Sequence, residues 1–211
     1  SPSFLSVDGQ ALAQNRVELI DENATNARCL VGSGYPAADV QLMVADPDTM
    51  QPCVSDHVGE IWVASPSVTH GYWGRLEATQ ETFAARPKGK GQRSFLRTGD
   101  LGFLHHGQLF ITGRIKDVII IRGGNHYPQD IEFSVEQSHE SLRPVGHSAA
   151  FSVEDGGEEK LVVIQEVKRS YLRYLNADEI FAAIRQCISE EHELQVSAIV
   201  LLKTASIPRT S

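Results

Sequence analysis

The sequence predicts an α+β fold in which a β-rich first part is followed by a small, compact α+β unit. Up to about residue 122, short strand-like segments are separated by clusters of Gly, Pro, Asp and Ser, and helical periodicity is weak. This pattern is typical of antiparallel or barrel-like β structure. After about residue 125 the pattern changes to alternating helices and strands. We place the boundary between the two parts near Lys116.

Four segments of the first part are predicted strands. Residues 40–44 end at the turn-rich sequence Ala-Asp-Pro-Asp-Thr, and residues 59–64 end at Ser-Pro-Ser. Residues 108–112 and 118–121 are apolar runs flanked by Gly107 and by the Gly123-Gly124 pair. We expect these last two segments to pair with each other.

The second part begins with a predicted helix at Pro128, a residue that suits a first helical turn. The acidic residues Asp130 and Glu132 favour a helix N-terminus, and Ile131 with Val135 gives an apolar pair four residues apart. The helix is therefore expected to be short and to bury one face.

A hairpin, a longer helix and a closing strand are predicted to follow. Residues 149–153 alternate in polarity and residues 161–167 are mostly apolar, with Asp-Gly-Gly between them to supply a turn. Asn176 can cap a helix with Glu179 three residues later, and residues 198–202 read as a strand. The helix would bury Ile180, Ile184 and Ile188, which fall on one face.

Composition excludes several classes of protein. Of 211 residues, 41% are hydrophobic and 22% charged, which is ordinary for a soluble globular protein. The net charge of -8 argues against a nonspecific nucleic-acid or anionic-membrane binder. Cys29, Cys53 and Cys187 are far apart and form no C-x-x-C pair, so we expect neither disulfides nor a zinc site. No apolar run approaches a membrane span and no export signal is visible, so we expect a cytoplasmic protein.

Several ordered motifs resemble one enzyme superfamily. Residues 97–102 read Arg-Thr-Gly-Asp-Leu-Gly, residues 107–132 continue through Gly-Arg-Ile-Lys-Asp, and residues 59–74 hold an earlier motif beginning Gly-Glu-Ile-Trp. Together they resemble the adenylate-forming superfamily of acyl-CoA synthetases, adenylation domains and luciferases. The Ile-Ile-Ile-Arg run and the Asn-His-Tyr-Pro turn of residues 125–128 are most similar to fatty acyl-AMP ligases. The resemblance covers essentially the whole chain.

The resemblance implies an organisation and a reaction. Residues 1–115 would be the β-rich end of a large N-terminal domain, and residues 116–211 a mobile α+β C-terminal domain. Such enzymes use ATP and Mg²⁺ to convert a carboxylic acid into acyl-AMP and pyrophosphate, and then transfer the acyl group to a thiol. The fatty acyl-AMP ligase branch would take a fatty acid and favour an acyl carrier protein, or a carrier domain of a polyketide or peptide synthase, over coenzyme A. A role in lipid, polyketide or lipopeptide metabolism is therefore expected.

Three residues match nucleotide-binding positions of this family. Asp100 would bind the ribose hydroxyls, because one carboxylate can accept two hydrogen bonds from a vicinal diol; the alternative is a turn-capping aspartate. Arg114 would lie near the nucleotide, or it would form a surface ion pair with an acid such as Asp117. Ile111 would pack near the adenine, or it would be an ordinary core residue of a strand.

Three further residues match positions linked to domain movement. Lys116 would be the hinge about which the C-terminal domain rotates between the two half-reactions, although a solvated lysine would look the same in sequence. Gly123 and Gly124 would permit backbone angles that a side chain forbids, in a loop that faces the active site in the second conformation. They could equally form only a hairpin turn. Many relatives carry Arg at the position of Gly124, so the contact that an arginine side chain would make there is not expected in this chain.

The histidines are not assigned to catalysis. His126 and the His105-His106 pair titrate near neutrality when unperturbed, but carboxylate activation by ATP depends on charge stabilisation more than on a general base. His105 and His106 are expected in a loop. His139 and His147 do not form an H-E-x-x-H motif, and no protein-bound metal is assigned.

Parts of the family pattern are missing from this sequence. It holds no Ser/Thr/Gly-rich phosphate loop ending in Lys, and the expected acyl tunnel would lie upstream of Ser1. Residues 207–211 resemble the start of a motif whose lysine would lie beyond Ser211, so we expect a C-terminal piece of a ligase with no catalytic residue of its own and little adenylation activity alone. Alternatives are a fatty acyl-CoA synthetase, a noncatalytic adenylation-like binding module, and a regulatory or structural α+β domain.

Overall fold

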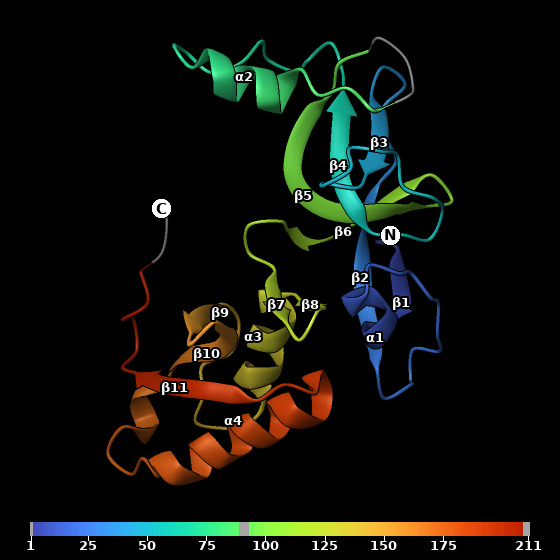
Figure 1. The fold of residues 1–211 in the computed structure, drawn as a ribbon. Coiled ribbons are helices and arrows are strands. Elements are labelled where there is room, and N and C mark those ends of the chain that lie inside the picture. Colours follow the sequence, from blue (N-terminus) through green and yellow to red (C-terminus); the bar gives the residue numbers. More distant parts are fainter. Residues whose placement is uncertain (1, 89–92, 209–211) are drawn as a thin grey trace. The chain divides into compact units, whose positions relative to one another are not determined.

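The computed structural model describes residues 2–88 and 93–208. The contacts between residues divide the chain into two compact units, Ser1–Lys116 (unit 1) and Asp117–Ser211 (unit 2). Strands dominate unit 1, and unit 2 combines helices with two small sheets (Figure 1).

Unit 1 contains a six-stranded antiparallel sheet in the order β1-β2-β6-β5-β4-β3. Its strands are β1 (Phe4–Asp8), β2 (Ala27–Gly34), β3 (Gln41–Ala45), β4 (Gly59–Ala64), β5 (Leu96–His105) and β6 (Gln108–Arg114). Strand β5 is the strongly curved ribbon of this sheet in Figure 1. Because β5 and β6 are joined by a short turn at His106 and Gly107, the motif of residues 97–114 folds back on itself.

Two helices of unit 1 were not predicted. In α1 (Gly9–Ala13), the Asp8 side chain caps the first turn by accepting a hydrogen bond from the Ala11 N–H at 2.8 Å. In α2 (Leu76–Phe83), no side chain caps the N-terminus and no residue is buried. Both helices are short and α2 has no buried stripe, so neither shows the periodic apolar pattern by which a helix is predicted from sequence.

The core of unit 1 is built on aromatic residues from neighbouring strands. Trp62 of β4 is completely buried and packs with Phe95, whose ring centroid lies 6.3 Å away. Phe103 and Phe110, from β5 and β6, stack with centroids 5.4 Å apart. The buried rings fix the middle of the sheet, where the sequence motifs lie.

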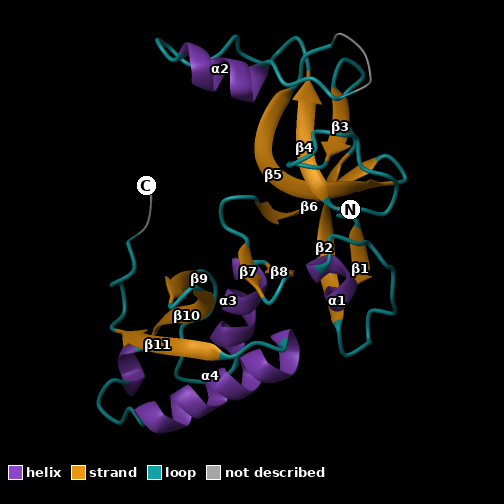
Figure 2. Ribbon diagram, viewed as in Figure 1, coloured by secondary structure: helices purple, strands orange, loops and turns teal. Residues whose placement is uncertain are grey.

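Unit 2 begins with a two-stranded hairpin and continues with two helices on a three-stranded sheet of order β11-β10-β9 (Figure 2). Strands β9 and β10 form a hairpin, and β11 runs parallel to β10. Its elements are β7 (Ile119–Ile121), β8 (Gly124–His126), α3 (Pro128–Gln137), β9 (Ser148–Asp155), β10 (Glu158–Glu166), the 3-10 helix η1 (Arg169–Tyr171), α4 (Ala177–His192) and β11 (Val196–Leu202).

One buried cluster joins both helices of unit 2 to one face of the sheet. Ile131 and Val135 of α3 are fully buried, as predicted, and so are the three isoleucines of α4. Asn176 caps α4 by accepting a hydrogen bond from the Glu179 N–H at 3.4 Å. On β9, Ala150 faces this core, whereas Phe151 and Val153 lie on the exposed face.

The predicted α+β fold class is confirmed, and so are the strands near residues 40–44 and 59–64. The predicted pairing of residues 108–112 with residues 118–121 is wrong: β6 pairs with β5 and β2, while β7 pairs with β8. Each run is followed or preceded by its own glycine turn, and a short turn pairs a strand with its immediate neighbour. In the described parts of the chain, no helix has the length and apolar character needed to cross a membrane.

Candidate functional site

Asp100 lies in a bulge of β5. Trp62 of β4 pairs with Arg97 and Glu60 pairs with Leu101, so Ile61 alone stands opposite Thr98, Gly99 and Asp100. Gly99 has a φ of +74°, in the left-handed region that glycine adopts without strain. A bulge re-aims the side chains of a strand, and this bulge includes the aspartate singled out by the sequence.

The polar backbone groups of the bulge have partners inside unit 1. The Gly99 N–H donates to Glu60 Oε1 at 3.1 Å, and the Asp100 N–H donates to Thr98 Oγ1 at 3.0 Å. The Thr98 hydroxyl in turn donates to the Ile61 carbonyl at 2.8 Å, and the Gly99 carbonyl accepts from the Ile115 N–H at 2.9 Å. These four hydrogen bonds hold the bulge in place from both sides.

Asp100 and Arg114 form an ion pair across β5 and β6. The two residues are paired in register, and Arg114 Nε lies 2.8 Å from Asp100 Oδ1. The side chain of Asp100 is 32% exposed and that of Arg114 is 64% exposed. An ion pair this open to water stabilises a fold by only about 0–1 kcal/mol, so both groups can be shared with a polar ligand at little cost.

Ile111 and Lys116 are both exposed. Ile111 of β6 pairs with Gly102 and is 44% exposed, so the alternative that it is an ordinary core residue is wrong. Lys116 lies in the turn of residues 115–117 that follows β6, and it is the last residue of unit 1. Of the six residues singled out by the sequence, the structure brings Asp100 and Arg114 into direct contact.

Gly123 and Gly124 differ in conformation. Arg122 and Gly123, with φ of 52° and 77°, form the two-residue turn of the β7–β8 hairpin. Gly124 opens β8 opposite Ile121 and its φ is not in the left-handed region. The expectation that Gly124 adopts backbone angles forbidden to other residues is therefore wrong, because it has the extended backbone of a strand residue. A Cβ there would lie 3.2 Å from His126 Nε2.

His105 and His106 lie at the turn between β5 and β6, and His126 ends β8. His105 is the last residue of β5 and His106, with φ of 49°, begins the turn, so the loop prediction is correct only for His106. Their rings meet edge to face with centroids 4.2 Å apart. Burial lowers the pKa of His126, against a backbone hydrogen bond with Ile121 that acts to raise it. Within residues 2–88 and 93–208, no three His, Cys, Asp or Glu side chains are grouped so as to hold a metal ion.

Sequence reasoning missed a buried glutamate in each unit. In unit 1, Glu60 of β4 is 2% exposed and accepts hydrogen bonds from Trp62, Arg97 and Gly99. An acid inside an otherwise apolar strand is a signal that could have drawn attention to it, because a buried charge needs partners. Its partners could not be identified from the sequence.

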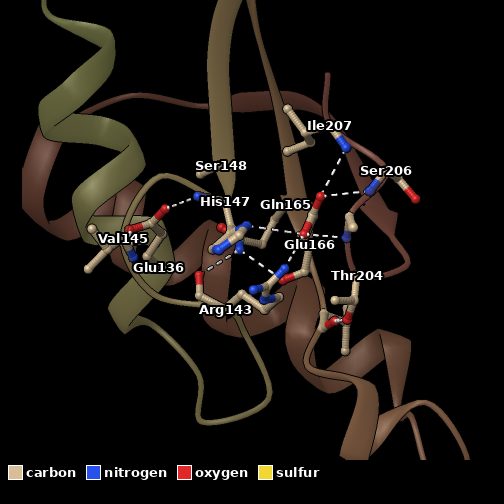
Figure 3. Close-up of polar contacts among 12 residues, drawn as sticks. Glu136, Arg143, Val145, His147, Ser148, Gln165, Glu166, Thr204, Ser206 and Ile207 are labelled. Carbon is tan, nitrogen blue, oxygen red and sulfur yellow. Dashed lines mark hydrogen bonds and ion pairs between the residues drawn. The ribbon is translucent and has the colours of Figure 1, made fainter. Parts of the chain in front are cut away.

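In unit 2, Glu166 at the end of β10 is 1% exposed and anchors residues 205–207 (Figure 3). Its carboxylate accepts from the backbone N–H groups of those three residues at 2.8 to 2.9 Å. Arg143 lies 2.8 Å and His147 3.2 Å from the same group. Burial acts to raise the pKa of Glu166, but hydrogen bonds from Ile207, Ala205, Arg143 and Ser206 lower it to about 2. Residues 209–211, the rest of the motif expected to lead to the family lysine, lie outside the described residues.

Two family models match the chain. Residues 14–73 match the AMP-binding enzyme family, and residues 116–211 match the AMP domain of the Disco-interacting protein 2-like family. The sites described above lie within or between these segments.

Curated relatives are similar over nearly the whole chain. The medium-chain-fatty-acid--[acyl-carrier-protein] ligase JamA of Moorena producens is 51% identical over 98% of this chain and 35% of its own length. The 4-hydroxyphenylalkanoate adenylyltransferase of Mycobacterium marinum is 36% identical over 100% of this chain and 34% of its own. The chain thus spans about a third of the length of these relatives.

Solved structures agree with these relatives. A crystal structure of the fatty acid AMP ligase from Legionella pneumophila is 43% identical, with a TM-score of 0.54 over 100% of this chain and 36% of that protein. A fatty acyl-adenylate ligase structure from work on the E. coli and L. pneumophila enzymes is 30% identical, with a TM-score of 0.81 over 99% of this chain and 35% of that protein. The chain is therefore similar to fatty acyl-AMP ligases and to AMP-binding enzymes, of which it spans about a third.

Proposed function

We propose that this chain is part of a fatty acyl-AMP ligase that uses ATP to convert a fatty acid into acyl-AMP and pyrophosphate. The observation that carries the proposal is the exposed Asp100–Arg114 pair on the β5 bulge, at the position where the superfamily motif has its ribose-binding acid. The names of the relatives, a fatty-acid ligase and an adenylyltransferase, support the same reaction.

The proposed role of Asp100 follows from its chemistry and exposure. A carboxylate is an acceptor with two oxygens, so it can accept hydrogen bonds from both hydroxyls of a ribose. Arg114, whose Nε bonds Asp100 Oδ1, would hold that carboxylate in place, with its guanidinium near the nucleotide oxygens. The exposed side chain of Ile111 would supply an apolar surface for the adenine. ATP and Mg²⁺ would arrive together, with the metal bound to the phosphates.

The two units would correspond to two domains with different tasks. Residues 1–115 would contribute the β-rich end of the large domain with the ribose contact, and residues 116–211 would form the mobile C-terminal domain. Lys116, in an exposed turn between β6 and β7, would be the hinge. The β7–β8 turn with Gly123 and Gly124 would be the loop that approaches the site in the second half-reaction.

The acyl acceptor is proposed to be the phosphopantetheine thiol of an acyl carrier protein or carrier domain. The relative of highest identity among those described is named for transfer to an acyl carrier protein, at 51% identity. Free coenzyme A is the second candidate, because mycobacterial relatives at 36 to 37% identity are named putative fatty-acid--CoA ligases.

The test is an acyl-transfer assay on the complete ligase that contains this sequence. Wild-type protein is incubated with ATP, Mg²⁺ and a panel of fatty acids, and coenzyme A is compared with phosphopantetheinylated carrier protein. Acyl-AMP formation with transfer only to the carrier protein is the expected result. Efficient acyl-CoA production would establish the synthetase instead, and the absence of any acyl-AMP would leave a noncatalytic adenylation-like module.

A further inference from the structure

We propose that Glu60 is a positioning residue that holds the β5 bulge so that Asp100 can reach the nucleotide; this inference rests on the proposed function. Glu60 does not present its own carboxylate to a ligand, because it is only 2% exposed. It belongs to β4, the strand next to the bulge. Its carboxylate bonds the backbone of Gly99, the residue that precedes Asp100.

The carboxylate of Glu60 collects three donors from different parts of unit 1. Oε2 accepts from Trp62 Nε1 at 2.9 Å and from Arg97 Nε at 2.8 Å, while Oε1 accepts from the Gly99 N–H at 3.1 Å. The guanidinium of Arg97 also lies over the Trp62 ring, 5.8 Å from its centroid. All three partners are donors, so the site requires a group that only accepts.

This requirement distinguishes glutamate from its closest substitute. A glutamine at position 60 has almost the same shape, but its amide nitrogen would face either Gly99 or the side chains of Trp62 and Arg97. Two donors would then point at each other in a buried place, and at least one hydrogen bond would be lost. A Glu60→Gln variant therefore removes the bonding pattern while it keeps the volume.

The link from Glu60 to Asp100 runs through the backbone of the bulge. The Gly99 N–H has left the β4–β5 ladder, and the Glu60 carboxylate replaces the strand carbonyl that it would otherwise bond. The Asp100 N–H is held by Thr98, whose hydroxyl is held by the Ile61 carbonyl, next to Glu60 in β4. Fixing Gly99 from one side and Asp100 from the other leaves the Asp100 side chain facing Arg114.

A double-mutant cycle on the complete ligase separates positioning from general stability. Glu60→Gln should raise KM for ATP by about tenfold to a hundredfold, because a charge-assisted hydrogen bond is lost. At saturating ATP, kcat should stay within about twofold, because no reacting group is touched. In a protein that already carries Asp100→Asn, Glu60→Gln should change KM by less than about twofold, since the two residues act as one unit.

The matched control is Glu136→Gln in unit 2. Glu136 is also a buried carboxylate, and it accepts from the backbone N–H groups of Val145 at 2.6 Å and His147 at 2.7 Å. This control should lower the melting temperature without a specific rise in KM for ATP. The same rise in KM for Glu136→Gln, or additive effects of the Glu60 and Asp100 changes, would overturn the proposal.

A second measurement does not depend on activity. Amide hydrogen exchange in the complete ligase should show a protected Gly99 N–H in the wild type and in Asp100→Asn, and fast exchange in Glu60→Gln. If the wild-type ligase forms no acyl-AMP, the proposed function fails, while the exchange data still decide whether Glu60 holds the bulge. Unchanged protection of Gly99 in Glu60→Gln would refute the positioning role whatever the activity.

Discussion

The two units each contain a buried glutamate that organises backbone N–H groups, but the surroundings of the two differ. Glu166 in unit 2 accepts hydrogen bonds from three consecutive backbone N–H groups, and its carboxylate also pairs with Arg143 and His147. Glu60 in unit 1 accepts one hydrogen bond from a backbone N–H, that of Gly99, and two from the side chains of Trp62 and Arg97. Next to Glu60, a second carboxylate, Asp100, remains at the surface with Arg114.

This difference indicates how a site can be distinguished from a structural anchor. The five groups around Glu166 converge on one buried carboxylate. The other acid in Figure 3, Glu136, is also buried and accepts from the backbone N–H groups of Val145 and His147. Around Glu60 the buried acid bonds the backbone of the bulge, and the second acid, Asp100, lies at the surface in an ion pair with Arg114. A buried charge that is fully satisfied serves the fold, whereas an exposed acid on a rigid bulge can serve a ligand.

The largest expected effect is on the stability of unit 2. Glu166→Ala should destabilise this unit by about 3–5 kcal/mol, because it leaves Arg143 and three backbone N–H groups without their shared acceptor. Hydrogen exchange of the amides in β10 and β11 measures the loss. The control Glu159→Ala, an exposed residue of the same strand, should stay within about 0.5 kcal/mol. Equal effects of the two changes would remove the contrast between the two glutamates.

The same carboxylate should make unit 2 sensitive to acid. The pKa of Glu166 is about 2 in the folded chain against 4.5 for the ordinary side chain, so the unfolded state binds its proton first as pH falls. The stabilisation is complete above about pH 5 and is lost between about pH 4.5 and about pH 2. Glu166→Gln, which cannot titrate, should flatten this part of the stability profile of β10 and β11. An unchanged profile would show that other groups determine the acid response.

An intermediate effect is expected at the junction of the two units. Lys116→Pro fixes φ and removes a backbone N–H, so transfer of the acyl group should slow by about tenfold, or about 1.4 kcal/mol, while acyl-AMP formation is largely kept. Single-turnover assays of the two half-reactions measure the split. Lys116→Ala, which leaves the backbone free, should resemble the wild type. Equal losses in both half-reactions of Lys116→Pro would count against the hinge.

The smallest effect is expected at the β7–β8 turn, which contributes no hydrogen bond to Glu60 or Glu166. Gly123 has a φ of +77° and open space where a Cβ would stand, so Gly123→Ala should cost roughly 1 kcal/mol through backbone strain alone. Gly123→Asn should cost less, because asparagine tolerates left-handed angles. Chemical denaturation followed by exchange at β7 and β8 compares the two. A larger loss with Asn than with Ala would show that side-chain contact, not backbone conformation, limits the turn.

The sequence predicted the elements whose signals are local. The Asn176 cap and the three isoleucines of α4 specify that helix, and the Asp-Gly-Gly turn specifies the β9–β10 hairpin. It predicted the wrong pairing for residues 108–112, because glycines mark where a chain turns but not which strands become neighbours. The uncapped α2 left no periodic pattern to read.

The candidate site was predictable in identity but not in arrangement. The motif pointed to Asp100 and Arg114, yet their contact depends on the register of β5 and β6, which brings together residues 14 apart in the chain. Glu60 bonds Arg97 and Gly99, which are 37 and 39 residues away. Such long-range partners are set by sheet topology, and no local pattern in the sequence carries that information.

The most direct test of the account is ATP-dependent acyl-AMP formation by the complete ligase, measured for the wild type and for Asp100→Asn. We expect acyl-AMP from the wild type, and a loss of about a hundredfold in kcat/KM for ATP in the variant, because two hydrogen bonds to the ribose are weakened. Asp39→Asn, at an exposed acid of the same unit, should behave as the wild type. Full activity of Asp100→Asn would contradict the assignment of the β5 bulge as the ribose site.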